Sequence, residues 1–299
     1  MEKSKKKWLS KSTPYIYIAP FFIGFITFSL YPTLYAFWLS FHEWSGTGDK
    51  IFIGLDNYIE AFQNRFFFNS LIVSARFMLI TPIATFFALV LAFLLGSKKV
   101  FKPNIYKFTY LMPFVAMPVT VGVIFRMLLG WDHGIINRIL YSLGIISENI
   151  NWLGEARFTF FAVALLVTWR FFGYHMVIYL GGLMSIDTHL YEAARIDGAS
   201  APQIFSRITI PLLKPYIVLL LMTGINGSMN LFDEPMTLYA GVHGGPEGAA
   251  RTIGLFNYFI VFISHRWGFG SATSFITFCI VCILSVLLYK LNYAKGMER

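Results

Sequence analysis

The stretch PYIYIAPFFIGFITFSLYPTLYAFWLSF, residues 14–41, contains no charged side chain. A helix needs about 20 apolar residues to cross the hydrocarbon core of a membrane, so this stretch is long enough to span one. Basic residues precede it, as they do in a signal peptide, but no small-residue cleavage site follows. We therefore expect an uncleaved first membrane span.

Five further apolar runs follow along the chain, and with the first they cover residues 15–41, 69–95, 106–129, 158–183, 216–232 and 272–291. A backbone in lipid must satisfy its own hydrogen bonds, which favours helices. The composition agrees, because 57% of the residues are hydrophobic and only 13% are charged. The predicted fold class is an all-α polytopic membrane protein with six transmembrane helices, in a single domain of residues 15–291.

The basic residues outside the runs are concentrated in alternate connections. They cluster before the first run, after the second, between the fourth and fifth, and at the C-terminal end. The positive-inside rule then places the tails, residues 1–14 and 292–299, in the cytoplasm together with residues 187–215. The net charge of +9 is therefore a topology signal, and we expect no nucleic-acid partner.

The sequence lacks the patterns that would indicate ATP hydrolysis, redox chemistry or metal binding. No GxxxxGK[ST] pattern occurs, so the chain itself has no usual site for splitting ATP. Cys279 and Cys282 form a CxxC spacing inside an apolar run, where two small membrane-facing side chains are the preferred interpretation. His175 has no second ligand at metal spacing, so we expect no metal site and no catalytic residue.

The polar segment between the fourth and fifth runs predicts two short helices. Asp187 or Thr188 can cap the first, which continues through HLYEAARI and stops near Gly198. Ser200 can cap the second, with Gln203 at the third helical position completing a capping box.

The second of these helices has an apolar stripe, and the first has a polar face. The stripe contains Ile204, Phe205, Ile208 and Leu212 at helical spacing, and it can lie on the membrane domain. Pro211 and Pro215 are expected to end that helix. The first helix presents charges of both signs and small alanines to the cytoplasm, which favours docking of a protein partner over a loop that rests on lipid headgroups. These residues are Glu192, Ala193, Ala194, Arg195 and Asp197.

The segment resembles the EAA loop of ABC-importer membrane subunits, whose pattern is EAA-x3-G-x9-I-x-L-P. The residues in register are Glu192, Ala193, Ala194, Gly198, Ile208 and Pro211, and Ile210 replaces the usual leucine. Other stretches resemble the carbohydrate branch of that family, with maltose-type and glycerol-phosphate-type subunits. They are GLDNYIEAF (residues 54–62), HGIINRIL (133–140), LFDEPMTLYAGVHGGPEGAARTIGLFNYFI (231–260) and FGSATSF (269–275).

The resemblance implies a multi-pass subunit of a bacterial-type plasma membrane, surrounded by lipid. Such a subunit pairs with a second, related permease, usually a different chain. Two cytoplasmic ATPase subunits bind the ATP and magnesium, and an extracytoplasmic binding protein delivers the sugar. The EAA loop, with Glu192 as the main polar contact and Gly198 at the bend, is implied to couple ATPase closure to alternating access.

A sugar site needs hydrogen-bonding groups and aromatic plates in a cavity between helices. TWRFFGYHM (residues 168–176) and TGINGSMNLFDE (residues 223–234) offer both. Arg170 lies inside a run, so its side chain is expected to face a cavity or a carboxylate. The resemblance matches Trp169 and Tyr174 with aromatic positions and Thr223 with a sugar-contacting hydroxyl.

Some of these assignments have alternatives. Asn226 and Asn230 fit the family pattern less cleanly, and they can instead bond the partner permease. Trp169 and Tyr174 can equally be packing aromatics. Arg170 replaces an apolar residue of the maltose subunit, which could suit an anionic or more polar saccharide. Arg76 and Arg126 lie nearer the span ends and are expected to snorkel or pair.

Three functional hypotheses follow from the sequence. The first is a permease subunit of an ATP-driven sugar importer, and the second is the same kind of subunit for a polyol or phosphodiester. The third is a stand-alone carrier or an intramembrane enzyme. Absence of a convincing internal repeat and of an acid–base pair within the runs disfavours the third hypothesis.

Overall fold

The computed structural model describes residues 15–96 and 101–293. The predicted basic tail of residues 1–14 lies outside the described residues, as does the C-terminal tail beyond residue 293. The described chain is predominantly helical, with one two-stranded hairpin, which confirms the predicted fold class. It forms two compact units. One extends to Asn64 and includes Ile260–Ile276, and the other includes Arg65–Phe259 and the chain from Thr277 onward.

The smaller unit contains the first span, which is helical over Tyr15–Leu39 and includes a π-helical segment, η1 (Ile26–Leu30), and helix α2 (Tyr31–Leu39). An antiparallel hairpin follows, formed by β1 (His42–Glu43) and β2 (Ile51–Phe52). Helix α3 (Asp56–Gln63) comes next, and the first residues of α16 (Trp267–Tyr293) belong to the same unit.

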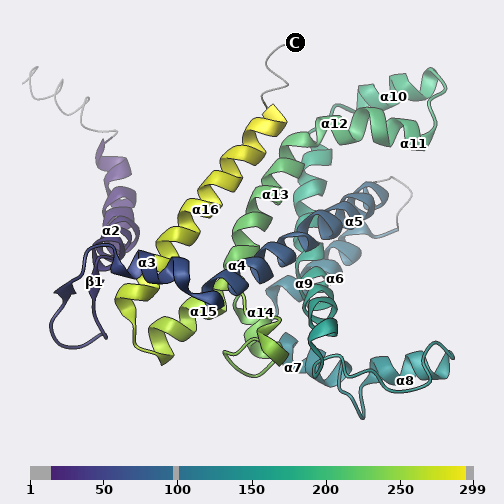
Figure 1. Ribbon diagram of the computed structural model, residues 1–299. Helices are drawn as coiled ribbons and strands as arrows, with labels where there is room; N and C mark the ends of the chain where they lie inside the picture. Colours follow the sequence, from purple (N-terminus) through teal and green to yellow (C-terminus); the bar gives the residue numbers. More distant parts are fainter. Residues whose placement is uncertain (1–14, 97–100, 294–299) are drawn as a thin grey trace, which may run out of the picture. The chain divides into compact units, whose positions relative to one another are not determined.

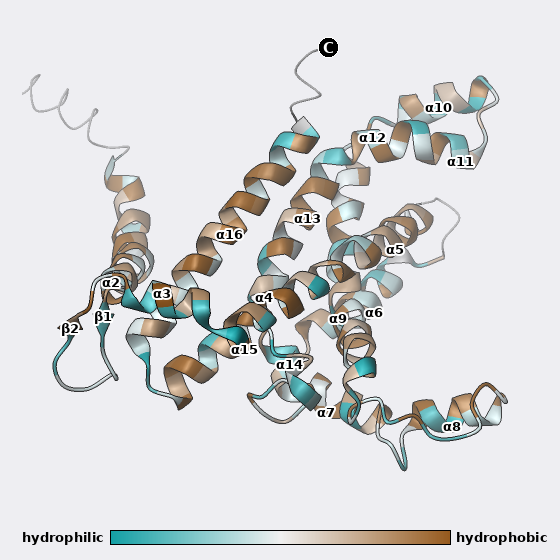
Figure 2. Cartoon of the chain, viewed as in Figure 1, coloured by the Kyte–Doolittle hydropathy of each residue, from teal (hydrophilic) through white to brown (hydrophobic). Residues whose placement is uncertain are grey.

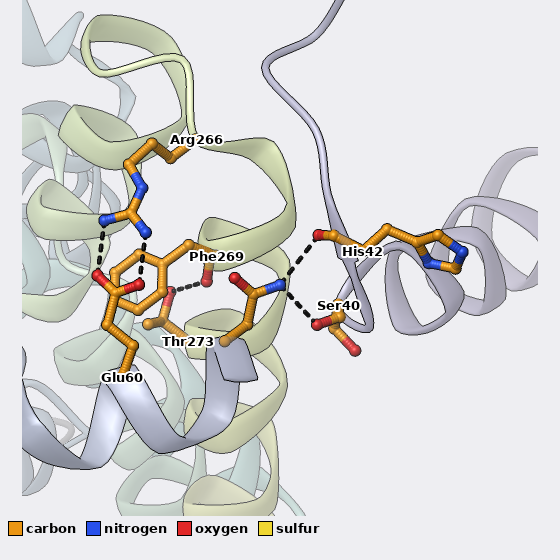
Figure 3. Close-up of polar contacts among 7 residues, drawn as sticks. Ser40, His42, Glu60, Arg266, Phe269 and Thr273 are labelled. Carbon is orange, nitrogen blue, oxygen red and sulfur yellow. Dashed lines mark hydrogen bonds and ion pairs between the residues drawn. The ribbon is translucent and has the colours of Figure 1, made fainter. Parts of the chain in front are cut away.

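Two sets of polar contacts hold α3 to its neighbours in this unit (Figure 3). The side-chain amide of Asn57 donates to the carbonyl oxygens of Ser40 and His42, at 2.9 and 3.0 Å. Arg266 donates two hydrogen bonds to the Glu60 carboxylate, at 2.6 and 2.5 Å. Asn57 belongs to the GLDNYIEAF stretch, so this stretch serves to tie the loop that leaves the first span to α3.

The larger unit contains the second to fifth spans and the part of α16 from Thr277 onward. The second is formed by α4 (Arg65–Met78) and α5 (Ile80–Leu95), and the fourth is the single helix α9 (Ala156–Met184). The third is bent, because α6 (Pro103–Val115) and α7 (Pro118–Leu128) meet at 95°. Ala116 and Met117 are extended, as expected for Met117 because it directly precedes Pro118.

The fifth span is also bent. Helix α13 (Lys214–Met229) meets the preceding helix of residues Ala201–Leu212 at 65°. Four helices of the described chain are long and apolar enough to cross a membrane, and the number rises to six when each bent pair counts as one span. The six predicted runs therefore all correspond to helices, with boundaries that differ by a few residues.

Helices α5 and α9 pack along each other and form the centre of the larger unit. Gly173 on α9 permits a close approach, because a Cβ atom there would lie 1.7 Å from the carbonyl oxygen of Tyr110 on α6. The long helices α13 and α16 are predominantly hydrophobic, whereas hydrophilic residues gather on short helices such as α3 and α14 (Asp233–Leu238) (Figure 2). Large apolar side chains such as Phe86, Phe87 and Leu94 are exposed, which suits a lipid-facing surface.

Candidate functional site

The segment of residues 187–215 begins with helix α10 (Thr188–Ile196). Of the two candidate caps, Asp187 performs this role, since its side chain accepts a hydrogen bond from the His189 backbone at 2.9 Å. The helix ends at Gly198, which has a φ of +78°. The next backbone N–H group, that of Ala199, donates to the carbonyl of Ala194 at 2.9 Å. The predicted glycine-terminated helix is confirmed.

The second helix begins at Ser200 with the predicted capping box. The Ser200 backbone N–H donates to Oε1 of Gln203 at 2.7 Å. The helix then continues through α11 (Ala201–Ile204), a π-helical turn η2 (Phe205–Thr209) and α12 (Ile210–Leu212).

Pro211 does not end this helix, contrary to the sequence prediction. It lies at the second position of α12, directly after the π-helical turn, and the chain bends only at Leu213. A proline in a regular α-helix clashes with the carbonyl four residues earlier and removes one hydrogen bond. The wider π-helical turn relieves that clash, because the Ile210 N–H donates to the carbonyl of Phe205, five residues back.

The predicted apolar stripe is correct for most of its length. Ile204 is 6% exposed, and the Phe205 ring lies 4.9 Å from the ring of Phe93 on α5. Leu212, at the end of the stripe, is instead 44% exposed. A polar contact joins the two helices of the segment, since the hydroxyl groups of Tyr191 and Thr209 lie 3.3 Å apart.

Helix α10 has no buried residue. Glu192, Ala193, Arg195 and Asp197 are exposed, and Ala194 is half-buried. The Glu192 carboxylate lies 3.4 Å from Nδ1 of His189, and both side chains are well exposed. Within the larger unit, α10 and α11 lie at the opposite end from α14 and α8 (Ile135–Ser142) (Figure 1). The motif residues therefore form a free surface at one end of the unit.

Trp169 lines a groove of about 680 Å³ between α6 and α9. The side chain is 45% exposed, and Tyr110, Thr109, Thr168 and Phe172 also line the groove. The lining is mostly apolar, with two threonine hydroxyls and aromatic rings. These are the groups that a weakly apolar sugar face and its hydroxyls can contact.

Arg170 is paired with a carboxylate, which was one of the two expected environments. Its Nη1 atom donates to Oε1 of Glu234 on α14, and the two side chains are 12% and 5% exposed. Burial raises the pKa of the Glu234 carboxyl, although the Arg170 guanidinium opposes this shift. Because its charge is paired and largely buried, Arg170 does not present a free cation to an anionic solute.

Glu234 was not among the residues predicted from the sequence. The available signal was Arg170 itself, because a guanidinium within a span needs a nearby carboxylate or water. The sequence could not identify which acidic residue supplies it, since Glu234 lies 64 positions away.

The other predicted substrate residues do not share the groove of Trp169. The Tyr174 ring stacks on Phe114 at 4.7 Å. Thr223 is exposed, and its hydroxyl donates to the carbonyl of Leu220 at 2.9 Å. Asn226 and Asn230 are exposed on α13, and their side chains bond to each other at 2.8 Å. The structure therefore places Trp169 at a concave surface and leaves the three polar residues on an exposed helix face.

Two further expectations concern charged and metal-binding groups. Arg126 is paired as expected, since it donates to the carbonyl oxygens of Thr237 and Leu238. Arg76 is exposed on α4. Among the described residues, no group of three His, Cys, Asp or Glu side chains is arranged to hold a metal ion. His175 is buried, with Nδ1 3.4 Å from the Thr85 hydroxyl.

Asn137 is the asparagine of the HGIINRIL stretch, to which the sequence assigned no structural role. It is 1% exposed, and its side-chain amide donates to the carbonyl of Ile150 at 2.9 Å. Its Oδ1 accepts from the indole N–H of Trp152 at 2.8 Å. Asn137 belongs to the HGIINRIL stretch, so this stretch holds together the loop that surrounds α8.

Comparison with known proteins identifies relatives over nearly the whole chain. The family described as Binding-protein-dependent transport system inner membrane component matches residues 58–295. The arabinooligosaccharides transport system permease protein AraP of Bacillus subtilis (strain 168) is 32% identical, covering 94% of this chain and 89% of AraP. The lactose transport system permease protein LacF of Rhizobium radiobacter is 31% identical, covering 92% of each chain.

The trehalose/maltose transport system permease protein MalF of Thermococcus litoralis is 31% identical, covering 97% of this chain and 96% of MalF. Among solved structures, a bacterial ABC transporter involved in the import of the acidic polysaccharide alginate has a chain with TM-score 0.78 and 19% identity, with coverage of 98% and 99%. The same fold occurs in a bacterial alginate ABC transporter in complex with an alginate pentasaccharide-bound periplasmic protein, with TM-score 0.77.

Proposed function

The chain belongs to the family of binding-protein-dependent transport system inner membrane components, and we propose that it is the membrane subunit of an ATP-driven sugar or oligosaccharide importer. The family match covers residues 58–295, which include five of the six spans and the EAA segment. Relatives that share about 30% of the sequence over most of their length carry names for arabinooligosaccharides, lactose and trehalose or maltose. This range of names supports a carbohydrate over a polyol or phosphodiester.

The surface of α10 is the observation that carries the proposal. An amphipathic helix that rested on lipid would expose a basic polar face, but α10 exposes Glu192, Arg195 and Asp197 together. Leu190 and Ile196 on the same helix are 47% and 87% exposed. Small, apolar and mixed-charge side chains on one short helix suit a protein groove. We assign that groove to a cytoplasmic ATPase subunit, with contacts from Glu192, Ala193, Ala194, Arg195 and Asp197.

The proposed coupling requires that a displacement of α10 is transmitted to the membrane spans. Gly198 turns the chain from α10 into α11, and the apolar face of that second helix packs on α5. The helix continues through Pro211 to the 65° bend at Leu213, where α13 begins. Closure of the ATPase pair is expected to tilt the second helix of the segment together with α13. This tilt switches the pathway between inward-facing and outward-facing states.

The remaining partners follow from the same proposal. A second, related permease completes the pathway, two ATPase subunits bind ATP and magnesium, and an extracytoplasmic binding protein delivers the solute. The complex of a similarly folded alginate transporter with a periplasmic protein supports the last of these. The subunit then lies in a bacterial-type plasma membrane with its two tails and α10 on the cytoplasmic side. The chain itself needs no cofactor or metal.

We assign the sugar contacts to the groove of Trp169 and to the exposed polar face of α13. Trp169 supplies an aromatic plate, and Thr223, Asn226 and Asn230 supply hydrogen-bonding groups. Tyr174 serves as a packing residue behind the groove, because its ring is stacked on Phe114. Arg170 is bonded to Glu234, so we assign it the role of positioning α14 and no contact with the solute.

The test of the proposed function is reconstitution of the chain with its partner permease, ATPase and binding protein in lipid vesicles. ATP hydrolysis is measured against a panel of neutral and acidic oligosaccharides, polyols and phosphodiesters. Stimulation of ATP hydrolysis by a saccharide alone supports the proposal. Stimulation by a polyol or phosphodiester alone contradicts it and supports the hypothesis of a permease for one of those solutes.

A crosslinking experiment tests the docking surface directly. Cysteine is placed at Ala194 on α10 in a background in which Cys279 and Cys282 are serine. The same substitution at exposed Leu143, at the other end of the larger unit, is the control. Ala194→Cys is expected to form a crosslink with the ATPase, and Leu143→Cys is not. Crosslinks from position 194 to lipid alone would refute the coupling role.

A further inference from the structure

Helix α14 directly follows the fifth span and is enclosed by two other spans of the larger unit. Glu234, Pro235 and Leu238 are buried, and Thr237 lies against α7. A Cβ atom at Gly122 on α7 would lie 2.2 Å from the Thr237 hydroxyl oxygen, so only glycine permits this approach. The helix also packs on α9. A short helix in such a position needs its terminal groups to be satisfied by neighbours.

The beginning of α14 is held from α9. The Glu234 carboxylate lies in the first turn, where a negative charge is favourable to the helix dipole, and Arg170 donates to it. Both side chains are largely buried, so the contact is shielded from water and salt.

The end of α14 is held from α7. Arg126 donates through Nη2 to the carbonyl of Thr237 and through Nε to the carbonyl of Leu238, the latter at 3.2 Å. These carbonyls belong to the last turn, where a helix has unsatisfied acceptors and a cation is favourable.

The two arginines are also connected to each other through their preceding residues. Phe125 and Trp169 pack together, with ring centroids 5.4 Å apart. Thus α7 and α9 contact each other through adjacent aromatic residues, and each directs an arginine to one end of α14. The arrangement joins three segments that are distant in the sequence.

We propose that Arg126 and Arg170 are positioning residues that clamp α14 onto α7 and α9, so that the three helices move as one block when the transporter changes access state. The inference rests on the proposed function. Helix α13 connects the cytoplasmic bend at Leu213 to α14 at the opposite end of the unit. Through the clamp, displacement of the fifth span is transmitted to the third span at Arg126 and to the middle of the fourth span at Arg170.

The first test compares substitutions in the complete transporter, reconstituted with its partners. The variants are Arg170→Gln, Glu234→Gln and the double variant, and the readout is solute transported per ATP hydrolysed at equal amounts of assembled complex. The control is Arg157→Gln, because Arg157 is on the same helix but forms an exposed ion pair with Glu155. Arg170→Gln is expected to lower transport per ATP by about tenfold, since it leaves a buried carboxylate unpaired.

Two outcomes of this test decide the proposal. The double variant has two amides in place of the two ions, so no charge is left unpaired. We expect its transport per ATP to be within about threefold of that of the unsubstituted transporter. If Arg170→Gln behaves like Arg157→Gln, or if the double variant is as impaired as Arg170→Gln, the proposal is wrong. Transport per ATP of each variant is compared with that of the unsubstituted transporter. If the proposed function is wrong, the unsubstituted transporter itself shows no solute-stimulated hydrolysis, so that failure is distinguishable from failure of the clamp.

The second test measures motion directly, first with the clamp intact and then with Arg170 substituted. Spin labels are placed at two exposed residues, Phe161 on α9 and Asp233 on α14, with Cys279 and Cys282 replaced by serine. The distance between the labels is expected to stay the same in the nucleotide-free and ATP-bound states. When Arg170→Gln is added, we expect the distance between the labels to differ between the nucleotide-free and ATP-bound states. A nucleotide-dependent distance with the clamp intact would overturn the proposal.

Discussion

The two ends of the larger unit are built in different ways. At one end, no residue of α10 is buried, and the contacts at its start are local, as in the cap formed by Asp187 and the contact of Glu192 with His189. At the other end, α14 has Glu234, Pro235 and Leu238 buried, and it is held by two arginines from helices far away in the sequence. Local contacts define the shape of α10, whereas tertiary contacts define the position of α14.

The difference indicates how each end responds to change. Exposed side chains contribute little to folding, so their substitution is expected to alter partner binding and to leave stability intact. Buried charges and close helix approaches contribute to folding itself, so changes there alter stability and position together. The following predictions test that division, in order of decreasing effect on stability.

The largest effect is expected at Gly173 on α9. Alanine there places a Cβ atom 1.7 Å from the backbone carbonyl of Tyr110, which cannot move without displacing α6. We expect Gly173→Ala to lower the free energy of unfolding by about 1–3 kcal/mol. Gly181 on the same helix is the matched control, because its Cβ would meet nothing within 4 Å. Denaturant unfolding of the two purified variants measures the difference, and equal stabilities would contradict the packing argument.

A smaller effect is expected at Gly198, where the backbone has a φ of +78° and a Cβ atom would meet nothing. Valine at this position is strained by about 1–2 kcal/mol, whereas asparagine tolerates the left-handed region. We expect Gly198→Val to reorient α10 and to uncouple transport from ATP hydrolysis, and Gly198→Asn to retain coupling. Normal uptake with solute-stimulated hydrolysis in the valine variant would refute the role of this turn.

The contact between Tyr191 and Thr209 is expected to have a modest effect. Tyr191→Phe and Thr209→Val each remove one hydroxyl from a pair separated by 3.3 Å, at a cost of about 0.5–1.5 kcal/mol. In thermal unfolding the double variant should be less destabilised than the sum of the two single variants, because both remove the same bond. Tyr141→Phe on exposed α8 serves as the control. Strict additivity would show that the two hydroxyls do not interact.

The smallest effect on stability is expected at Glu192. Its carboxylate is exposed and interacts only weakly with His189, so Glu192→Ala should change the free energy of unfolding by less than about 0.5 kcal/mol. If α10 docks in an ATPase, however, the same variant should strongly reduce solute-stimulated ATP hydrolysis. Measuring both on one preparation separates docking from folding, and a stable variant with full stimulation would remove Glu192 from the docking surface.

Much of the segment of residues 187–215 could be predicted because its determinants are short-range. The capping box of Ser200 and Gln203 and the glycine turn at residue 198 depend on residues at most a few positions apart. The prediction failed at Pro211, because a π-helical turn before it accommodates the proline ring. Such a turn depends on how Thr209 and its neighbours pack, with Thr209 fully buried, and not on a local residue preference.

The surroundings of the residues proposed to contact the solute were less predictable. Trp169 could be selected as an aromatic residue in a span, but its position at a groove depends on the approach of α6 to α9. The partner of Arg170 depends on the return of the chain after the fifth span, which brings Glu234 into contact. Neither pairing leaves a pattern in the sequence around the residue concerned.

The sequence by itself determined that the chain is a helical membrane protein with an exposed polar helix between its fourth and fifth spans, because length, hydrophobicity and turn chemistry act within short stretches. Only the tertiary structure decided that the third span bends by 95°, that Pro211 lies within a helix, and that α14 is held at both ends by arginines. These features depend on which helices come together and on the cost of leaving a charge or a carbonyl unpaired inside the protein.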